Sequence, residues 1–362
     1  MINKQVLKPD ERALLTLRSL YGSYGYLPFK MSKFEEYDLY VRNKDFLISD
    51  SIITFTDTSG KLLALKPDVT LSIIKNGTDE AGCKQKVYYN ENVYRPSGET
   101  RQYKEIMQAG LECIGDIGVY DLYETLFLAA KSLESISEDF VLEVSHLGIL
   151  RGILDDVNGG ADFDSEIIRL VKEKNAHEIG ALCRDRGVSK EMTEVLRSFV
   201  TIYGDPDSVL ERLEPICKNE VSRGALDTLR QIRGLFGDRE IARKLRFDFS
   251  MVSDMNYYSG IVFGGFIDGI PESVLSGGQY GKLMKKMGRR SDAVGFALYL
   301  DLLEGLERES VKYDVDVLLL CGKDAEASAI AARTEELVAS GRSVSVQRAI
   351  PERLRYRELI EL

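Results

Sequence analysis

The sequence of 362 residues predicts an α+β fold built on a largely antiparallel sheet. Short β-type runs are concentrated between residues 51 and 110, the following stretch from about 151 to 240 is mostly helix-forming, and strand patterns then return. Segregation of this kind differs from the regular alternation of a doubly wound parallel sheet. We therefore expect a core in two parts, residues 1–150 and 241–310. A helical insertion at residues 151–240 separates them, and a short C-terminal β-α-β unit follows at residues 311–362.

The first part of the core is predicted to begin with a helix and to continue with strands. Asp10 precedes an amphipathic run with apolar residues at helical spacing, and Gly22 is a candidate terminator. IITFTD and KLLALKPD are predicted strands joined by a turn at DTSG, and KVYYNENVYR is a third strand. A second helix is predicted at YDLYETLFLAAKSLESI, with Asp121 and Glu124 as a capping box.

Strand patterns return after the helical stretch. LRFDFSMV alternates apolar and polar residues, and YYSGIVFGGF follows it. Beyond Tyr313, the segments VDVLLLCG, DAEASAIAARTEELVAS and SVSVQ predict one β-α-β unit. This unit contains Gly322 but no GxGxxG, so it lacks the fingerprint of a dinucleotide-binding site.

Composition excludes several classes of function. A net charge of −10 disfavours a free-standing nucleic-acid binder, and five cysteines without a CxxC pair disfavour a disulfide framework or a cysteine zinc site. His146 and His177 are the only imidazoles, so we expect no histidine metal site. The start of the chain lacks an apolar signal region, and no run approaches the ~20 apolar residues of a membrane span. We expect a cytoplasmic protein without a metal ion or cofactor.

Polar side chains suited to a small ligand recur in three segments. LALKPDVTL places three of them at period two, which predicts one face of a strand: Lys66, Asp68 and Thr70. QAGLE repeats that spacing with Gln108, Gly110 and Glu112. NVYRPSGETRQYKE places Arg95 at a strand end. Each segment alone is consistent with a solvated strand face, but carboxylates, an arginine and an amide together match a free amino acid.

The segment SDMNYYSGIVFGG, residues 253–265, is typical of a pocket wall. Glycines allow close approach of a ligand, and tyrosines combine an apolar ring with a polar tip. The four residues just before the tyrosines, Ser253 to Asn256, include no base, nucleophile or cation. If the strand is regular, Tyr257 and Tyr258 point to opposite faces and only one meets the ligand.

In this order the segments resemble the catalytic core of histidyl-tRNA synthetases, a family of class II aminoacyl-tRNA synthetases. YGYLPFKMSKFEEYDLY resembles the first motif, with Ser32 at its usual proline, LKPDVT is similar to the RPEGT-type loop, and VYRPS with QAGLE resembles the second motif. NYYSGIVF, GGQYGKL and AVGFALYLDLL resemble the later motifs. The resemblance covers roughly residues 7–310 and implies a class II synthetase-like antiparallel core flanked by helices. Carried over residue by residue, it implies a histidine-binding pocket of Asp68, Thr70, Arg95, Gln108, Glu112, Tyr257 and Tyr258.

The positions that bind the nucleotide in that family are changed. In place of an arginine, a glutamate and two further arginines, the chain has Ser253, Ser97, Leu302 and Gln279. Adenylation depends on fixed cations that neutralise developing charge, and one such donor contributes about 3 kcal/mol. The nearby Asp254 and Asp301 add charge of the wrong sign, so adenylation is not expected.

The chain is more similar to the ATP phosphoribosyltransferase regulatory subunits, which keep this core without its chemistry. That resemblance implies a non-catalytic subunit that binds histidine, dimerises through residues 7–40 and joins a short-form catalytic subunit in a hetero-oligomer. There it would be required for, and feedback-regulate, the first step of histidine biosynthesis. Only about 50 residues follow Tyr313, in place of a full anticodon-binding domain, so no tRNA partner is expected. A histidine–tRNA ligase with a divergent active site and a stand-alone histidine-binding sensor remain as alternatives.

Three further features have structural interpretations. The basic run GKLMKKMGRR is interpreted as a solvated face. Cys113 follows Glu112 directly and is therefore expected on the opposite, core-facing side of its strand. His146 lies in an apolar setting and is expected to be a packed histidine, with a place on the pocket floor left open.

Overall fold

The computed structural model describes residues 9–47, 51–78, 80, 82–96, 102–252, 257–305 and 313–362. Two compact units divide the chain, Met1–Leu306 and Glu307–Leu362. No described helix has the length and apolar character needed to cross a bilayer.

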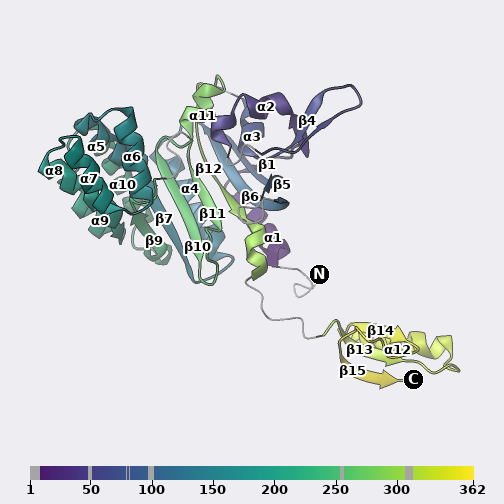
Figure 1. Ribbon diagram of the computed structural model, residues 1–362. Helices are drawn as coiled ribbons and strands as arrows, with labels where there is room; N and C mark the ends of the chain where they lie inside the picture. Colours follow the sequence, from purple (N-terminus) through teal and green to yellow (C-terminus); the bar gives the residue numbers. More distant parts are fainter. Residues whose placement is uncertain are drawn as a thin grey trace. The chain divides into compact units, whose positions relative to one another are not determined.

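A nine-stranded sheet forms the centre of the first unit (Figure 1). Its strands are, in spatial order, β1 (Leu27–Pro28), β5 (Gln85–Pro96), β6 (Tyr103–Gly115), β12 (Asp292–Tyr299), β11 (Leu275–Gln279), β10 (Ile261–Ile267), β7 (Phe140–His146), β9 (Leu245–Asp248) and β8 (Tyr203–Gly204). Only the β1–β5 and β7–β9 pairs are parallel among these neighbours. The predicted α+β class with a largely antiparallel sheet is therefore confirmed.

One face of this sheet is covered by helices. Helix α1 (Pro9–Ser23) packs against β5 and β6, and α4 (Val119–Glu134) packs against β7, β10 and β12. The side chains of β6 point alternately to the two faces of the sheet. Ala109, Leu111 and Cys113 enter the main hydrophobic core on this side. The residues between them, including Glu112, face the other way, so the predicted core position of Cys113 is confirmed.

Two predicted helix ends differ from the structure. Helix α1 continues through Gly22, and the chain turns at Gly25, whose φ of 80° favours glycine. Helix α4 starts before Asp121, because the Asp121 carboxylate accepts the Gly118 amide at 2.8 Å and caps the first turn from within it. Glu124 instead pairs with Lys86.

The segment between β7 and β9 is mainly helical, and its helices gather beside that edge of the sheet (Figure 1). They are α5 (Leu147–Val157), α6 (Ala161–Lys172), α7 (Ala176–Asp185), α8 (Lys190–Ser198), α9 (Pro206–Leu213) and α10 (Glu220–Phe236), with short 3-10 turns η3 (Phe199–Thr201) and η4 (Glu240–Lys244). Side chains of Asn175, Ser189, Asp205 and Asn219 accept backbone amides at four of the helix starts. Strand β8 also comes from this segment, for which the sequence predicts helices.

The second face of the large sheet carries smaller elements and a second hydrophobic cluster. A three-stranded antiparallel sheet is made of β2 (Phe34–Glu36), β4 (Leu62–Leu65) and β3 (Thr54–Thr56). Beside it lie α2 (Tyr37–Val41), η2 (Lys44–Phe46), α3 (Thr70–Asn76) and α11 (Gly281–Lys286), and η5 (Leu300–Gly305) follows β12.

The prediction that Lys66, Asp68 and Thr70 share one strand face is wrong. Strand β4 ends at Leu65, and Thr70 is the first residue of α3. Pro67 has no amide hydrogen for a strand ladder, and the Asp68 carboxylate accepts the Leu71 amide at 2.9 Å. A proline followed by a helix-capping aspartate therefore ends the strand that the period-two pattern suggested.

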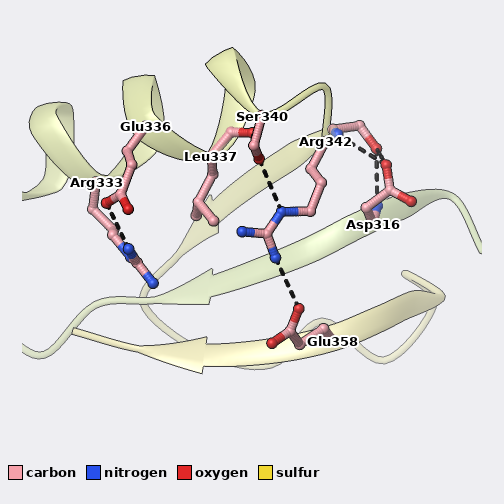
Figure 2. Close-up of polar contacts among 8 residues, drawn as sticks. Asp316, Arg333, Glu336, Leu337, Ser340, Arg342 and Glu358 are labelled. Carbon is pink, nitrogen blue, oxygen red and sulfur yellow. Dashed lines mark hydrogen bonds and ion pairs between the residues drawn. The ribbon is translucent and has the colours of Figure 1, made fainter.

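The second unit is a parallel three-stranded sheet with one helix. It comprises β13 (Val315–Leu320), α12 (Ala327–Ala339), β14 (Val344–Gln347) and β15 (Tyr356–Glu361), with β13 in the middle. The last strand was not predicted. Figure 2 shows how the unit is tied together: Arg342, just after α12, contacts Ser340 and reaches Glu358 on β15 at 3.0 Å, and Asp316 binds the loop that leads into β14.

Candidate functional site

A cavity of about 250 Å³ lies on the β6 face that carries Gln108, Gly110 and Glu112. All seven residues of the predicted pocket line it, although they come from four separate segments of the chain. They are Asp68, Thr70, Arg95, Gln108, Glu112, Tyr257 and Tyr258. The structure therefore brings together every residue that the sequence analysis proposed for one site.

Glycines form the part of the floor nearest Glu112. Gly295 on β12 lies directly opposite Glu112, and a Cβ atom there would be 1.7 Å from the Glu112 Oε2. A Cβ atom on Gly110 would lie 2.2 Å from the Phe296 carbonyl oxygen and 2.5 Å from the Tyr89 hydroxyl. The strands thus leave room for one carboxylate and one phenol ring only because these two positions have no side chain.

Glu112 is the buried acidic centre of the cavity, with 2% of its surface exposed. Thr70 Oγ1 donates a hydrogen bond to Oε1 at 3.0 Å, and the Tyr280 hydroxyl donates to Oε2 at 2.5 Å. Burial nevertheless dominates and raises the pKa of Glu112 to about 8. The carboxyl group is consequently able to hold or release a proton near neutral pH.

A second acid lies beside a cation in the same wall. The Arg95 Nη2 atom is 3.8 Å from Asp68 Oδ2, and Arg95 Nε donates to the Pro67 carbonyl oxygen at 2.5 Å. Burial raises the pKa of Asp68 even though Arg95 opposes that shift. Among the described lining residues Arg95 is the single cation, so it is the natural partner for a ligand carboxylate.

Gln108 has an unused hydrogen-bond donor. Its side chain is 2% exposed, it lines the cavity, and its Nε2 atom has no hydrogen-bond partner among the described residues. Leaving a buried donor without a partner costs about 1–3 kcal/mol. A bound polar ligand that accepts from this amide would remove that cost.

The expectation that only one of Tyr257 and Tyr258 meets the ligand required a regular strand, and the structure has no strand at these two residues. Both residues line the cavity, with ring centroids 4.7 Å apart in an edge-to-face arrangement. The alternation rule does not apply because β10 begins only at Ile261. Phe46 packs beside Tyr257 at a centroid distance of 6.0 Å, which extends the aromatic wall.

Several lining residues were missed by the sequence analysis, notably Phe46, Tyr89, Ser276, Tyr280 and Tyr299. Tyr280 lies within the GGQYGKL segment, so the motif itself contained a signal. Phe46 and Tyr89 lie outside the motifs that suggested the site. Only their positions in the folded structure identify them as cavity-lining residues.

Histidyl-tRNA synthetases have arginines at several positions that bind the nucleotide. At the described positions among these, this chain has no cation. Gln279 donates to Asp292 at 2.5 Å, Leu302 is half-buried and packs against the main core, and Asp301 is exposed. Ser97, Ser253 and Asp254 lie outside the described residues.

The remaining polar candidates have structural partners. His146 Nδ1 accepts the Gly148 amide at 3.1 Å at the start of α5, outside the cavity lining, and burial lowers its pKa to about 4. Lys286 pairs with Asp45 at 2.7 Å, and Arg289 donates to two carbonyl groups at the end of α3. No group of three or more potential metal ligands occurs within the part of the chain that the structure describes.

Comparison with known proteins identifies relatives that match most of the chain. The family model for histidyl-tRNA synthetase matches residues 5–303. ATP phosphoribosyltransferase regulatory subunits are similar: that of Caldanaerobacter subterraneus subsp. tengcongensis is 30% identical over 81% of this chain and 77% of its own length, and that of Oceanobacillus iheyensis is 29% identical over 79% and 71%.

Solved structures share the fold. A protein from Bacillus halodurans, described as an ATP phosphoribosyltransferase regulatory subunit/histidyl-tRNA synthetase, has a TM-score of 0.78 at 21% identity, covering 98% of this chain and 93% of that one. The histidyl-tRNA synthetase of Nostoc sp. PCC 7120 has a TM-score of 0.73 at 19% identity, covering 98% and 88%. A chain of the ATP phosphoribosyl transferase complex from Thermotoga maritima has a TM-score of 0.64 at 19% identity, covering 80% and 97%.

Proposed function

The chain belongs to the family of ATP phosphoribosyltransferase regulatory subunits, and from this premise we propose that its cavity binds free histidine and thereby regulates a catalytic partner. As a regulatory subunit in histidine biosynthesis, it leaves catalysis to that partner. The observation that carries the proposal is the buried, unpartnered Gln108 amide in a cavity that also holds Glu112 and Arg95.

The groups in the cavity suit each part of a histidine molecule. Arg95 supplies the cation for a carboxylate, and Asp68 supplies a carboxylate for an ammonium group. The aromatic wall suits a flat ring, and Glu112 provides an acceptor for a ring N–H group. This pairing gives Arg95, Asp68, Glu112 and the aromatic wall one role each and requires no nucleotide.

Histidine should stabilise the purified chain by mass action, by about 2.7 kcal/mol at one hundred times the dissociation constant. Glu112→Ala and Arg95→Ala should each remove most of the rise in melting temperature, because each leaves a charged or polar ligand group without its partner. Thermal unfolding with and without histidine measures the shift. Glu191→Ala and Arg197→Ala, which change surface residues away from the cavity, serve as matched controls. Wild-type shifts in both cavity variants would place the histidine elsewhere.

The regulatory role is tested with a short-form ATP phosphoribosyltransferase from the same organism. We expect the two chains to co-purify, the mixture to be more active than the catalytic subunit alone, and histidine to inhibit only the mixture. Typical allosteric couplings change affinity roughly 5–150-fold, and linkage requires the catalytic subunit's substrates to weaken histidine binding by the same factor. Equal histidine affinity by calorimetry with and without partner and substrates would favour the stand-alone sensor.

The ligase alternative predicts a different result. A histidine–tRNA ligase would catalyse histidine-dependent exchange of pyrophosphate into ATP. The loss of cations at Ser253 and Leu302 argues against this reaction, since each fixed donor of that kind contributes about two to three decades in rate. Measurable exchange by the purified chain would overturn the regulatory proposal.

A further inference from the structure

We infer that Tyr299 closes one end of the cavity and restricts it to a free amino acid, excluding molecules that are extended from the amino acid's carboxylate. Tyr299 is thus a specificity-determining residue. This inference rests on the proposed function in that it takes the ligand to be an amino acid, and it holds for any amino acid that the cavity accepts.

The floor becomes bulkier along one direction. On β12, the residues that face the cavity are Gly295, Ala297 and Tyr299. They lie opposite Glu112, Gly110 and Gln108 of β6, respectively. The side chain therefore grows from hydrogen to methyl to phenol as the cavity runs from the Glu112 end to the Gln108 end, and the open floor ends at Tyr299.

A hydrogen bond holds the Tyr299 side chain in this position. Its hydroxyl lies 2.8 Å from Ser276 Oγ, on the neighbouring strand β11. Ser276 itself lines the cavity and is paired in register with Ala297. The ring is thus held between two strands at a lining position, where a swing away would break a bond in a half-buried site.

The carboxylate end of a ligand lies toward the same side. Arg95 is paired with Lys104, further along β6 from Glu112 than Gln108 is. Because Arg95 is the single described cation in the lining, it directs a ligand carboxylate toward the Gln108 end. Tyr299, opposite Gln108, lies on β12 at this same end of the floor.

The size of the cavity fits this restriction. Its volume of about 250 Å³ lies below the ~300–1,000 Å³ that is typical of sites for drug-sized ligands. Placing additional atoms against the bulk of the Tyr299 ring is unfavourable, so a ligand extended from its carboxylate should bind less tightly while Tyr299 is present.

The test is calorimetry with the twenty free amino acids and, for each one that binds, its dipeptide with a C-terminal glycine. The proteins are the full wild-type chain, Tyr299→Ala and Tyr299→Phe. Wild type should bind the free amino acid at least about tenfold more tightly than its dipeptide. Tyr299→Ala should bring the two affinities within about threefold. Tyr299→Phe, which keeps the ring but loses the hydrogen bond to Ser276 Oγ, should show a preference between those of the wild type and Tyr299→Ala, because the bulk remains and the ring is no longer held.

The outcomes separate this inference from the proposed function. Tight binding of the dipeptide by wild type, or an unchanged preference in a folded Tyr299→Ala, would overturn the role of Tyr299 while leaving histidine binding intact. If an amino acid other than histidine binds with the expected preference, the role of Tyr299 is supported and the histidine proposal fails. Absence of binding by all twenty amino acids would overturn both.

Discussion

Glu112 shows how one buried side chain can combine structural and chemical roles. Two hydroxyl groups, of Thr70 and Tyr280, donate to its carboxylate, and this favours the ionised form. Burial in the second hydrophobic cluster opposes ionisation and outweighs both hydrogen bonds. A ligand that brings an N–H group or a positive charge would favour the ionised form of Glu112. Ligand binding and proton release are therefore expected to be linked.

The raised pKa of Glu112 should make the ligand-free protein less stable as pH rises. Below the ordinary pKa of 4.5 the carboxyl is protonated in both the folded and the unfolded chain, so its burial costs little. Between 4.5 and about 8 the unfolded chain loses the proton while the folded chain keeps it. The free energy of unfolding should therefore fall across this window by an amount on the order of a few kcal/mol. Urea unfolding from pH 5 to 8 measures this change.

Glu112→Gln is the matched variant for that measurement, because it preserves shape and cannot ionise. Its free energy of unfolding should fall less with pH than that of the wild type, with the difference confined to the same window. All other titrating groups are common to both proteins. Identical pH dependence in the two proteins would show that the Glu112 pKa is not raised.

At the scale of elements, the site depends on how β6 and β12 approach each other. Their antiparallel register places Gly295 against Glu112 and Ala297 against Gly110, so the two strands together form a floor of very small residues. The loop after β4 contributes Asp68 and Val69 to the cavity lining, and an ion pair between the buried Lys66 and Glu91 on β5 holds the loop. Neither element forms the cavity alone.

Gly295→Ala should disrupt this floor. The new Cβ atom would meet the Glu112 carboxylate at 1.7 Å and the Leu111 carbonyl oxygen at 2.4 Å, and a backbone atom cannot move aside easily. We expect a loss of about 1–3 kcal/mol in the free energy of unfolding and loss of histidine-induced stabilisation. Chemical denaturation and thermal shift measure the two effects.

Gly234→Ala is the matched control for the glycine substitution. Gly234 lies in α10, and a Cβ atom there would have nothing within 4 Å. This variant should be more stable than wild type by about 0.5–1 kcal/mol, because alanine favours the helix, and should bind histidine normally. If Gly295→Ala behaved in the same way, the proposed close approach of β6 and β12 would be wrong.

At the scale of the whole molecule, the described residues between 9 and 40 include exposed apolar side chains. The edge strand β1 exposes 68% of Leu27. On the three-stranded sheet, the rings of Phe34 and Phe55 contact each other at 5.4 Å and remain accessible. Exposed apolar groups that gather on edge strands and small sheets commonly mark interaction sites, so we propose that two copies of the chain associate here.

Sedimentation equilibrium should therefore detect a dimer at micromolar concentration. Leu27→Asp and Phe34→Asp should shift the chain toward monomer, because each would bury a charge in the interface. Leu235→Asp, which places a charge at an exposed position on α10, should leave the dimer unchanged. A stable wild-type monomer at micromolar concentration would count against the proposal.

Local patterns in the sequence were sufficient to predict the fold class, the family and the seven residues that the structure brings to one cavity. These properties depend on local signals: period-two alternation placed Gln108 and Glu112 on one face of β6, and ordered motifs identified the family. The local pattern was sufficient to predict the facing of the β6 side chains because each side chain of a strand can point to only two faces of the sheet.

How those residues meet depends on packing between distant segments, which the sequence patterns do not show. The Pro67 and Asp68 pair ended a strand that periodicity would have continued, and Tyr257 and Tyr258 both reached the cavity because they precede β10. The contact between Tyr299 and Ser276, which lie on different strands, has no signal in the local sequence. A cavity's shape and the pKa of its groups depend on packing and burial contributed by all of its neighbours, and those neighbours are set by strand register rather than by any one segment.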